Sequence, residues 1–197
     1  MFRRDAIIAL VLAALLVTSL SLRPALAIET AARYAFMIDD QTGRILLEKD
    51  ADEPMAPASM SKLMTLYMLF ERLSDGSLNL DDTFPVSEKA WRTGGSKMFV
   101  GVNTRVRIED LLRGIIVQSG NDACVVVAEG LASSEDAFAA EMTTRAQELG
   151  LTNSTFSNAT GWPDPDHRMS SRDLTKIAQM IIRQFPQYYP LFSEKTY

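Results

Sequence analysis

The sequence predicts an α+β fold in which a short β-hairpin precedes a mainly helical body. Two apolar segments, residues 34–38 and 44–48, flank a turn that ends at Gly43, and this arrangement is typical of an antiparallel hairpin. Most of the remaining apolar residues recur at helical spacing. The 197 residues are 47% hydrophobic and 23% charged, which is the composition of a globular protein with enough apolar material for a core.

The first 27 residues have the pattern of a signal peptide. Arg3 and Arg4 precede an apolar segment, residues 6–20, and residues 25–27 (Ala-Leu-Ala) offer the small residues of a cleavage site. An apolar segment of this length is short for a membrane-spanning helix, which needs about 20 residues. We therefore expect export with removal of residues 1–27, which leaves residues 28–197 as the folded domain.

Charge and cysteine content exclude several functional classes. The formal net charge is -5 and no Lys/Arg-rich segment occurs, which argues against nucleic acid as a partner. The one cysteine, Cys124, cannot form an internal disulfide, and its apolar neighbours predict a buried thiol. His and Cys residues are not clustered as metal ligands, so we expect no metal and no other cofactor.

A buried helix is expected after the hairpin. The linker formed by residues 50–57 ends in a proline, a residue tolerated at helix starts, and the helix begins near Ser59. It is apolar around most of its circumference, so it should be central rather than superficial. Residues 75–77 (Asp-Gly-Ser) end it. Its apolar positions are Leu63, Leu66, Tyr67, Met68, Leu69, Phe70 and Leu73.

Further helices are predicted along the rest of the chain. They cover residues 87–91, 108–117, 122–131 and 171–184, with one more that begins at Ser133 and ends at Gly150. Ser133 and Asp136 have the spacing of a capping box, and Ser170 with Asp173 is expected to cap the last helix. Loops are expected over residues 78–97 and 151–168.

Ser59 and Lys62 are the first candidates for chemistry. Positions three apart lie on one face of a helix, so the hydroxyl and the amine can meet. A serine is a weak nucleophile until a base takes its proton, and a lysine can be that base if burial or a nearby cation lowers its pKa. An isolated Ser-x-x-Lys also recurs by chance, so the pair needs support from the rest of the chain.

Ser119-Gly120-Asn121 offers that support between two predicted helices. The glycine allows a tight bend from which a hydroxyl and a carboxamide project, and these groups can relay a proton and hold a peptide group. The alternative is an ordinary helix–helix turn. The one histidine, His167, lies in a polar loop where bonding the loop to itself is the simpler role. If Ser59 is a nucleophile, its base is therefore expected to be Lys62.

Three stretches together resemble the low-molecular-mass penicillin-binding proteins, specifically the D-alanyl-D-alanine carboxypeptidases. They are residues 57–65 (PASMSKLMT), residues 114–124 (GIIVQSGNDAC) and residues 161–173, which include His167 and Asp173. The resemblance runs from about Arg33 to the end. It implies a DD-peptidase/β-lactamase-like transpeptidase fold and an exported periplasmic enzyme that removes the terminal D-alanine of peptidoglycan stem pentapeptides.

The resemblance also implies a role for each candidate residue. Ser59 would attack the D-Ala-D-Ala carbonyl, and Lys62 would take its proton. Ser119 would pass a proton to the departing D-alanine, and Asn121 would hold the acyl part of the substrate. The backbone amide of Ser59, at a helix N-terminus, would form half of the oxyanion hole. β-Lactams would acylate Ser59.

The family's third motif, Lys-Thr-Gly on a strand, has no counterpart. Lys195-Thr196-Tyr197 differs, because a tyrosine stands where glycine lets the substrate backbone approach. We therefore expect an incomplete catalytic domain that lacks the C-terminal strands of a five-stranded antiparallel sheet. The family's later domain and its amphipathic C-terminal helix, which attaches members to the inner membrane, would also be absent. The chain alone should then be inactive or nearly so.

Three alternative functions share parts of this pattern. A β-lactamase of the same superfamily needs a Glu-x-x-Leu-Asn segment after the second motif, and none occurs between Asn121 and Tyr197. A muropeptide DD-endopeptidase and a non-catalytic cell-wall-binding or regulatory relative remain open.

Overall fold

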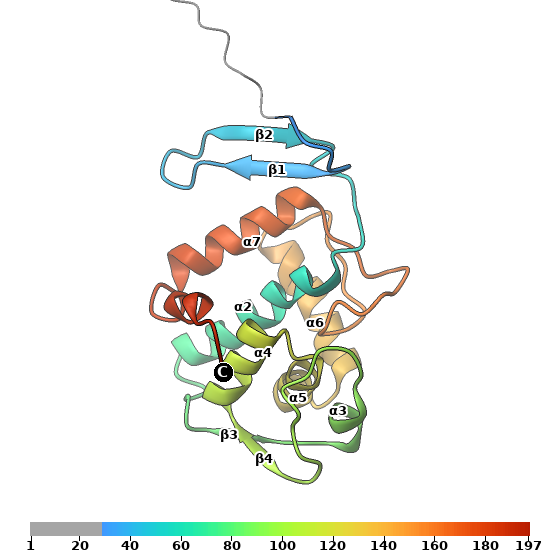
Figure 1. Ribbon diagram of the computed structural model, residues 1–197, viewed down its shortest axis with the longest axis vertical. Helices are drawn as coiled ribbons and strands as arrows, with labels where there is room; N and C mark the ends of the chain where they lie inside the picture. Colours follow the sequence, from blue (N-terminus) through green and yellow to red (C-terminus); the bar gives the residue numbers. More distant parts are fainter. Residues whose placement is uncertain (1–28) are drawn as a thin grey trace, which may run out of the picture. The chain divides into compact units, whose positions relative to one another are not determined.

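The computed structural model describes residues 29–197, and the predicted signal peptide, residues 1–27, lies outside the described residues. The chain divides after residue 31, and the fold below is that of residues 32–197. In chain order its elements are β1 (Ala35–Ile38), β2 (Ile45–Lys49), η1 (Ala58–Ser61), α2 (Lys62–Ser74), β3 (Thr83–Pro85), α3 (Glu88–Arg92), β4 (Arg105–Arg107), α4 (Ile108–Gln118), α5 (Asn121–Ala132), α6 (Glu135–Glu148), α7 (Ser171–Gln184) and η2 (Tyr189–Ser193) (Figure 1). The predicted α+β class is confirmed.

The hairpin β1–β2 forms where it was expected. Its strands are antiparallel, with Phe36 opposite Glu48. In the turn, the backbone amide and hydroxyl of Thr42 both donate to Asp39 Oδ1 at 2.7 Å, and Gly43 takes a φ of +71°. The helix α7 packs against β1, and the Arg172 guanidinium lies 4.3 Å from the centre of the Phe36 ring (Figure 1).

The helix α2 is the buried centre of the helical part, as its sequence predicts. It contacts α4, α5, α6 and α7. Met64, Leu69 and Phe70 have no exposed surface, and burial of one such side chain stabilises the fold by about 1.5–3 kcal/mol. The first turn differs from a regular α-helix, because Ala58–Ser61 forms a 3₁₀ turn before α2 begins.

The predicted start of the helix after α5 is wrong by one residue. Ser133 is the C-terminal cap of α5, in a left-handed conformation with φ +66°, and its neighbour Ser134 caps α6 by accepting the Ala137 amide at 3.1 Å. The chain must reverse between two helices here, and Ser133 makes the reversal. Two adjacent serines satisfy a capping pattern equally well, so the sequence alone does not separate them.

The strand pair β3–β4 was not predicted. Each strand has three residues, and Thr83 lies opposite Arg107 across a long connection that contains α3. Hairpin signals depend on a short turn between strands, and none exists here. The short 3₁₀ segment η2 near the end of the chain was also missed.

The long polar loop, residues 151–168, is tied to the N-terminus of α7. Ser170 Oγ accepts the Asp173 amide at 3.1 Å, which confirms the predicted cap. The Asp173 carboxylate turns back to accept the Asn153 amide and the Ser154 hydroxyl, both at 2.9 Å. The first turn of α7 therefore holds the start of the loop in place, because Asp173 binds both the helix cap and the loop.

Cys124 has no exposed surface, which confirms the prediction of a buried thiol. Desolvation raises the pKa of this thiol to about 12, so it is neutral and unreactive in the folded protein. Among the helices that the structure describes, none has the length and apolarity needed to cross a bilayer.

Candidate active site

Ser59 and Lys62 meet as predicted. Lys62 Nζ donates to Ser59 Oγ at 3.0 Å and to the carbonyl oxygen of Thr160 at 2.7 Å. The 3₁₀ turn favours the first contact, because side chains three apart eclipse each other in that geometry. Lys62 is only 3% exposed, and the desolvation lowers the pKa of its amine below the usual 10.5. The pair is thus a hydroxyl in contact with a buried amine that loses its proton more easily than a surface lysine does.

The Ser59 turn is built against a glycine of the distant loop. Ala58 has a φ of +50° and Gly161 a φ of +80°. A β-carbon at position 161 would lie 1.9 Å from the Ala58 carbonyl oxygen and 2.6 Å from Ser61 Oγ. Only glycine allows this approach.

Asn158 fixes the loop that faces Lys62. Its Oδ1 accepts the backbone amides of Thr160, Gly161 and Trp162 at 3.1, 2.8 and 3.1 Å. Three amides on one oxygen hold the local backbone in a single conformation. The Thr160 carbonyl is thereby aimed at Lys62.

Ser59 and Asn121 line one cavity of about 290 Å³. Asn121 Nδ2 donates to the Gly94 carbonyl at 2.9 Å, and within the described residues its Oδ1 has no hydrogen-bond partner. That oxygen can accept an N–H from a bound peptide. The residues that line the cavity are Ala56, Pro57, Ala58, Ser59, Ser96, Asn121, Thr160, Gly161, Trp162, Pro163, Asp164 and His167.

Ser119 is placed at the bend but not in the cavity lining. It ends α4 with a φ of +55°, and the Gly120 amide closes the turn on the Gly114 carbonyl at 2.9 Å. In the part of the chain that the structure describes, the Ser119 hydroxyl makes no hydrogen bond. The structure therefore brings Ser59, Lys62 and Asn121 together. Ser119 precedes Asn121 by two positions in the sequence but does not line the cavity.

The comparison with known proteins decides the family. A family model described as D-alanyl-D-alanine carboxypeptidase (peptidase S11) matches residues 21–197. The chain belongs to this carboxypeptidase family. The membership confirms the resemblance that the motifs around Ser59 and Asn121 predict.

Individual members of the carboxypeptidase family support the same assignment. D-alanyl-D-alanine carboxypeptidase DacF of Bacillus subtilis is 37% identical over 152 residues, which cover 77% of this chain and 39% of that protein. The crystal structure of the carboxypeptidase DacD from Francisella tularensis has a TM-score of 0.84 at 36% identity and covers 88% of this chain and 42% of that one. Penicillin binding protein 5 from Haemophilus influenzae has a TM-score of 0.83 at 36% identity, over 87% and 51%. The chain spans about two-fifths of the curated relative's length.

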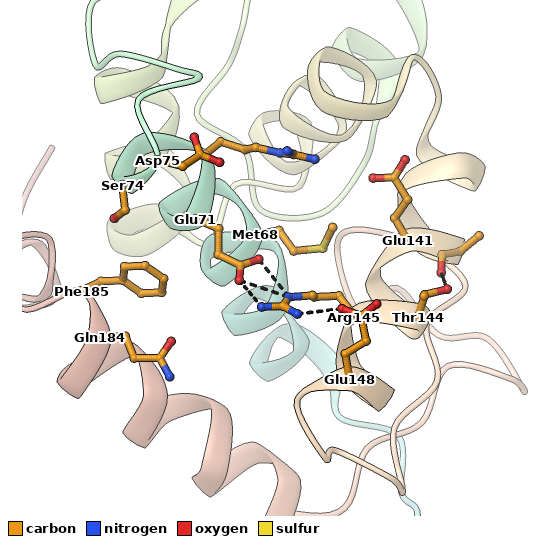
Figure 2. Close-up of a pocket in the computed structure, with 12 residues that line it drawn as sticks. Met68, Glu71, Ser74, Asp75, Glu141, Thr144, Arg145, Glu148, Gln184 and Phe185 are labelled. Carbon is orange, nitrogen blue, oxygen red and sulfur yellow. Dashed lines mark hydrogen bonds and ion pairs between the residues drawn. The ribbon is translucent and has the colours of Figure 1, made fainter.

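A larger hollow lies elsewhere in the described part of the chain. A groove of about 830 Å³ lies between α2, α6 and the end of α7, where Arg145 donates to Glu71 at 2.6 Å and to Glu148 at 2.7 Å (Figure 2). Glu71 lies nine residues beyond Lys62, which is about 14 Å along the helix. The groove contains neither the serine nor the lysine of the predicted pair, so size alone would misplace the site.

His167 bonds its own loop, as predicted. Its Nδ1 accepts the Ser157 amide at 3.3 Å, and its ring meets Phe156 edge-on at 5.4 Å between centroids. Burial lowers the pKa of His167, so the imidazole is neutral at pH 7. No hydrogen bond joins it to Ser59 within residues 29–197.

Sequence reasoning assigned no role to two kinds of residue in the candidate site. Asp122, with no exposed surface, accepts the Met98 and Val100 amides at 3.0 and 3.2 Å and so holds residues 98–100 beside Asn121. Trp162 and Asp164 enter the cavity from the long loop. All three residues lie in the stretches that carry the family resemblance, residues 114–124 and 161–173, but local spacing assigns none of them a role.

Proposed function

We propose that the protein is a serine-type D-Ala-D-Ala carboxypeptidase in which Ser59 forms the acyl-enzyme with peptidoglycan stem pentapeptides. The observation that carries this proposal is the 3.0 Å hydrogen bond between Lys62 Nζ and Ser59 Oγ, made by a lysine that is 3% exposed. A serine and a base in contact are the signature of an activated nucleophile. The family membership supports the substrate class.

Lys62 has the hydrogen-bonding capacity that a general base needs. A neutral amine has two N–H donors and one lone pair. One N–H can remain on the Thr160 carbonyl at 2.7 Å while the lone pair accepts the proton of the Ser59 hydroxyl. Burial favours this neutral form because it penalises the ammonium.

Acylation follows from this arrangement. Ser59 Oγ forms a bond to the carbonyl carbon of the penultimate D-alanine as its proton passes to Lys62. The backbone amide of Ser59, in the first turn of a helix, faces the developing oxyanion. Asn121 accepts an N–H of the acyl part, and Ser119 relays the proton taken up by Lys62 to the amine of the departing D-alanine. Water then hydrolyses the ester and frees Ser59.

The cellular setting is part of the same proposal. The predicted signal peptide supports export, and stem peptides and β-lactams are the partners of the site. The name of the Haemophilus relative, a penicillin binding protein, supports the second partner. We place the enzyme in the periplasm, with the complete protein held at the inner membrane by a C-terminal amphipathic helix.

Acylation by a labelled penicillin tests the proposal. We expect mass spectrometry to locate the adduct on Ser59 in the complete product of the gene, and Ser59→Ala and Lys62→Ala to abolish it. Lys176→Ala, which changes a partly exposed lysine of α7, is the matched control and should label normally. Absence of an adduct would favour a non-catalytic wall-binding protein. Release of D-alanine from pentapeptides, rather than cleavage of cross-linked dimers, would separate the carboxypeptidase from the endopeptidase.

We also propose that residues 28–197 alone turn over slowly or not at all, since no Lys-Thr-Gly motif occurs in the sequence. Among the described residues, this proposal assigns one oxyanion donor, the Ser59 amide. D-Alanine release at an ordinary rate by purified residues 28–197 would contradict this.

A further inference from the structure

One residue gives the Ser59 cavity a charge. Among the described residues that line it, Asp164 alone has a formal charge at neutral pH, because His167 is neutral. Lys62 lies beneath the lining. The Asp164 carboxylate is therefore the charged group on the lining that a ligand entering the cavity meets.

Asp164 stands between two cavities. A second cavity, of about 330 Å³, shares Thr160, Trp162, Pro163 and Asp164 with the first. Its other acid, Glu135, is already engaged by Lys89 at 2.8 Å and by the Ala159 amide at 3.1 Å. A ligand that extends from Ser59 into the second cavity passes Asp164, whose charge is not neutralised by a cation in the part of the chain described.

The Asp164 carboxylate is oriented by one of its oxygens. Oδ1 accepts the Ser157 hydroxyl at 2.9 Å and the Asp166 amide at 2.8 Å. These bonds, the Asp166 amide first, lower the pKa of Asp164 and keep it ionised. Oδ2 makes no hydrogen bond to any described residue, so it can accept one from a ligand.

Trp162 adds an aromatic surface beside this carboxylate. Its side chain is 55% exposed, and its ring packs against Gly95, where a β-carbon would lie 3.1 Å from Cζ3. An indole face attracts ammonium groups through its quadrupole. A carboxylate and an indole that line the same cavity form a site for a primary ammonium.

We propose that Asp164 and Trp162 select acyl donors that carry a primary ammonium on the residue preceding D-alanyl-D-alanine. This inference rests on the proposed function, because it takes Ser59 as the attacking group. The residue concerned is one peptide unit, about 3.8 Å, from the residue whose carbonyl Ser59 attacks. A lysine-like side chain can extend from there toward the junction of the two cavities.

The test compares two peptides that differ in one charge. Nα-acetyl-L-Lys-D-Ala-D-Ala keeps the side-chain ammonium, whereas the Nα,Nε-diacetyl form lacks it. Binding is measured by tryptophan fluorescence in a Ser59→Ala, Trp91→Phe chain, which cannot acylate and in which Trp162 is the remaining tryptophan. We expect the free-amine peptide to bind about fivefold more tightly, as one partly exposed charge pair allows.

Asp164→Asn should bring the two affinities together while it keeps the Oδ1 acceptor that holds the loop. Asp166→Asn is the matched control, since it removes the same charge from the same loop outside the cavity lining, and it should preserve the preference. Raising the ionic strength should reduce the preference. Equal affinities in the parent, a preference that survives Asp164→Asn, or no response of Trp162 to either peptide would each overturn the inference.

Penicillin labelling separates this inference from the proposed function. Labelling of Ser59 without an amine preference overturns the inference and leaves the carboxypeptidase assignment in place. An amine preference in a protein that penicillin never labels would overturn the carboxypeptidase assignment, and with it the selection of acyl donors, and would leave only an ammonium-binding site at Asp164 and Trp162.

Discussion

Replacing Gly161 by alanine tests whether the contact between the long loop and the Ser59 turn holds the site together. Two costs arise. A left-handed backbone costs an alanine about 1–2 kcal/mol. The new β-carbon would also lie 1.9 Å from the Ala58 carbonyl oxygen, which is backbone and cannot rotate away. Overpacking of this kind costs about 1–3 kcal/mol, so we expect the free energy of unfolding to fall by about 2–5 kcal/mol.

The matched control is Gly150→Ala. Gly150 has a φ of +75°, close to the +80° of Gly161, but a β-carbon there meets no atom within 4 Å. Gly150→Ala should therefore lower the free energy of unfolding only by the cost of a left-handed alanine, about 1–2 kcal/mol. The difference between the two variants isolates the contact with Ala58.

The same change should impair chemistry. To relieve the clash the loop must retreat by about 1 Å, which would lengthen the 2.7 Å bond from Lys62 to Thr160 beyond hydrogen-bonding range. Misplacement of this size costs on the order of 100-fold in rate. Urea unfolding and the rate of penicillin labelling of Ser59 provide the two measurements. If Gly161→Ala matched Gly150→Ala in both, the loop contact would be irrelevant to the site.

Three further predictions concern buried groups. Because burial lowers the pKa of Lys62, the neutral amine becomes more abundant as pH rises, so penicillin labelling should accelerate with pH and level off below pH 10.5; a rate that still rises beyond that pH would contradict Lys62 as the base. The Cys124 thiol, with its pKa raised to about 12, should resist iodoacetamide in the native protein and react only as the chain unfolds in urea; fast native alkylation, read by mass spectrometry, would contradict its burial. Asp122→Asn replaces one acceptor by a donor that faces a backbone amide, so the free energy of unfolding should fall by about 1–3 kcal/mol. The control Asp136→Asn, in the first turn of α6, should lower it by less than about 1 kcal/mol. Equal losses for the two variants in urea unfolding would refute the role of Asp122.

The sequence by itself determined the features that depend on neighbours along the chain. The turn at Gly43, the cap formed by Ser170 and the spacing of Ser59 and Lys62 each follow from backbone geometry over three or four residues. The burial of α2 was also readable, because a helix that is apolar on most sides must be covered. The choice between Ser133 and Ser134 was not, since both satisfy the same local pattern.

Only the tertiary structure decided what surrounds the serine. The carbonyl that Lys62 binds belongs to Thr160, 98 residues further on, and Gly161 beside it must be glycine because of a turn a hundred residues away. Trp162 and Asp164 enter the cavity by the same loop. Such contacts depend on how the loop folds back over α2, and spacing along the chain says nothing about them. The local pattern therefore predicted Ser59 as the nucleophile and Lys62 as its base, while packing selected the groups that lower the pKa of Lys62 and that give the cavity its charge.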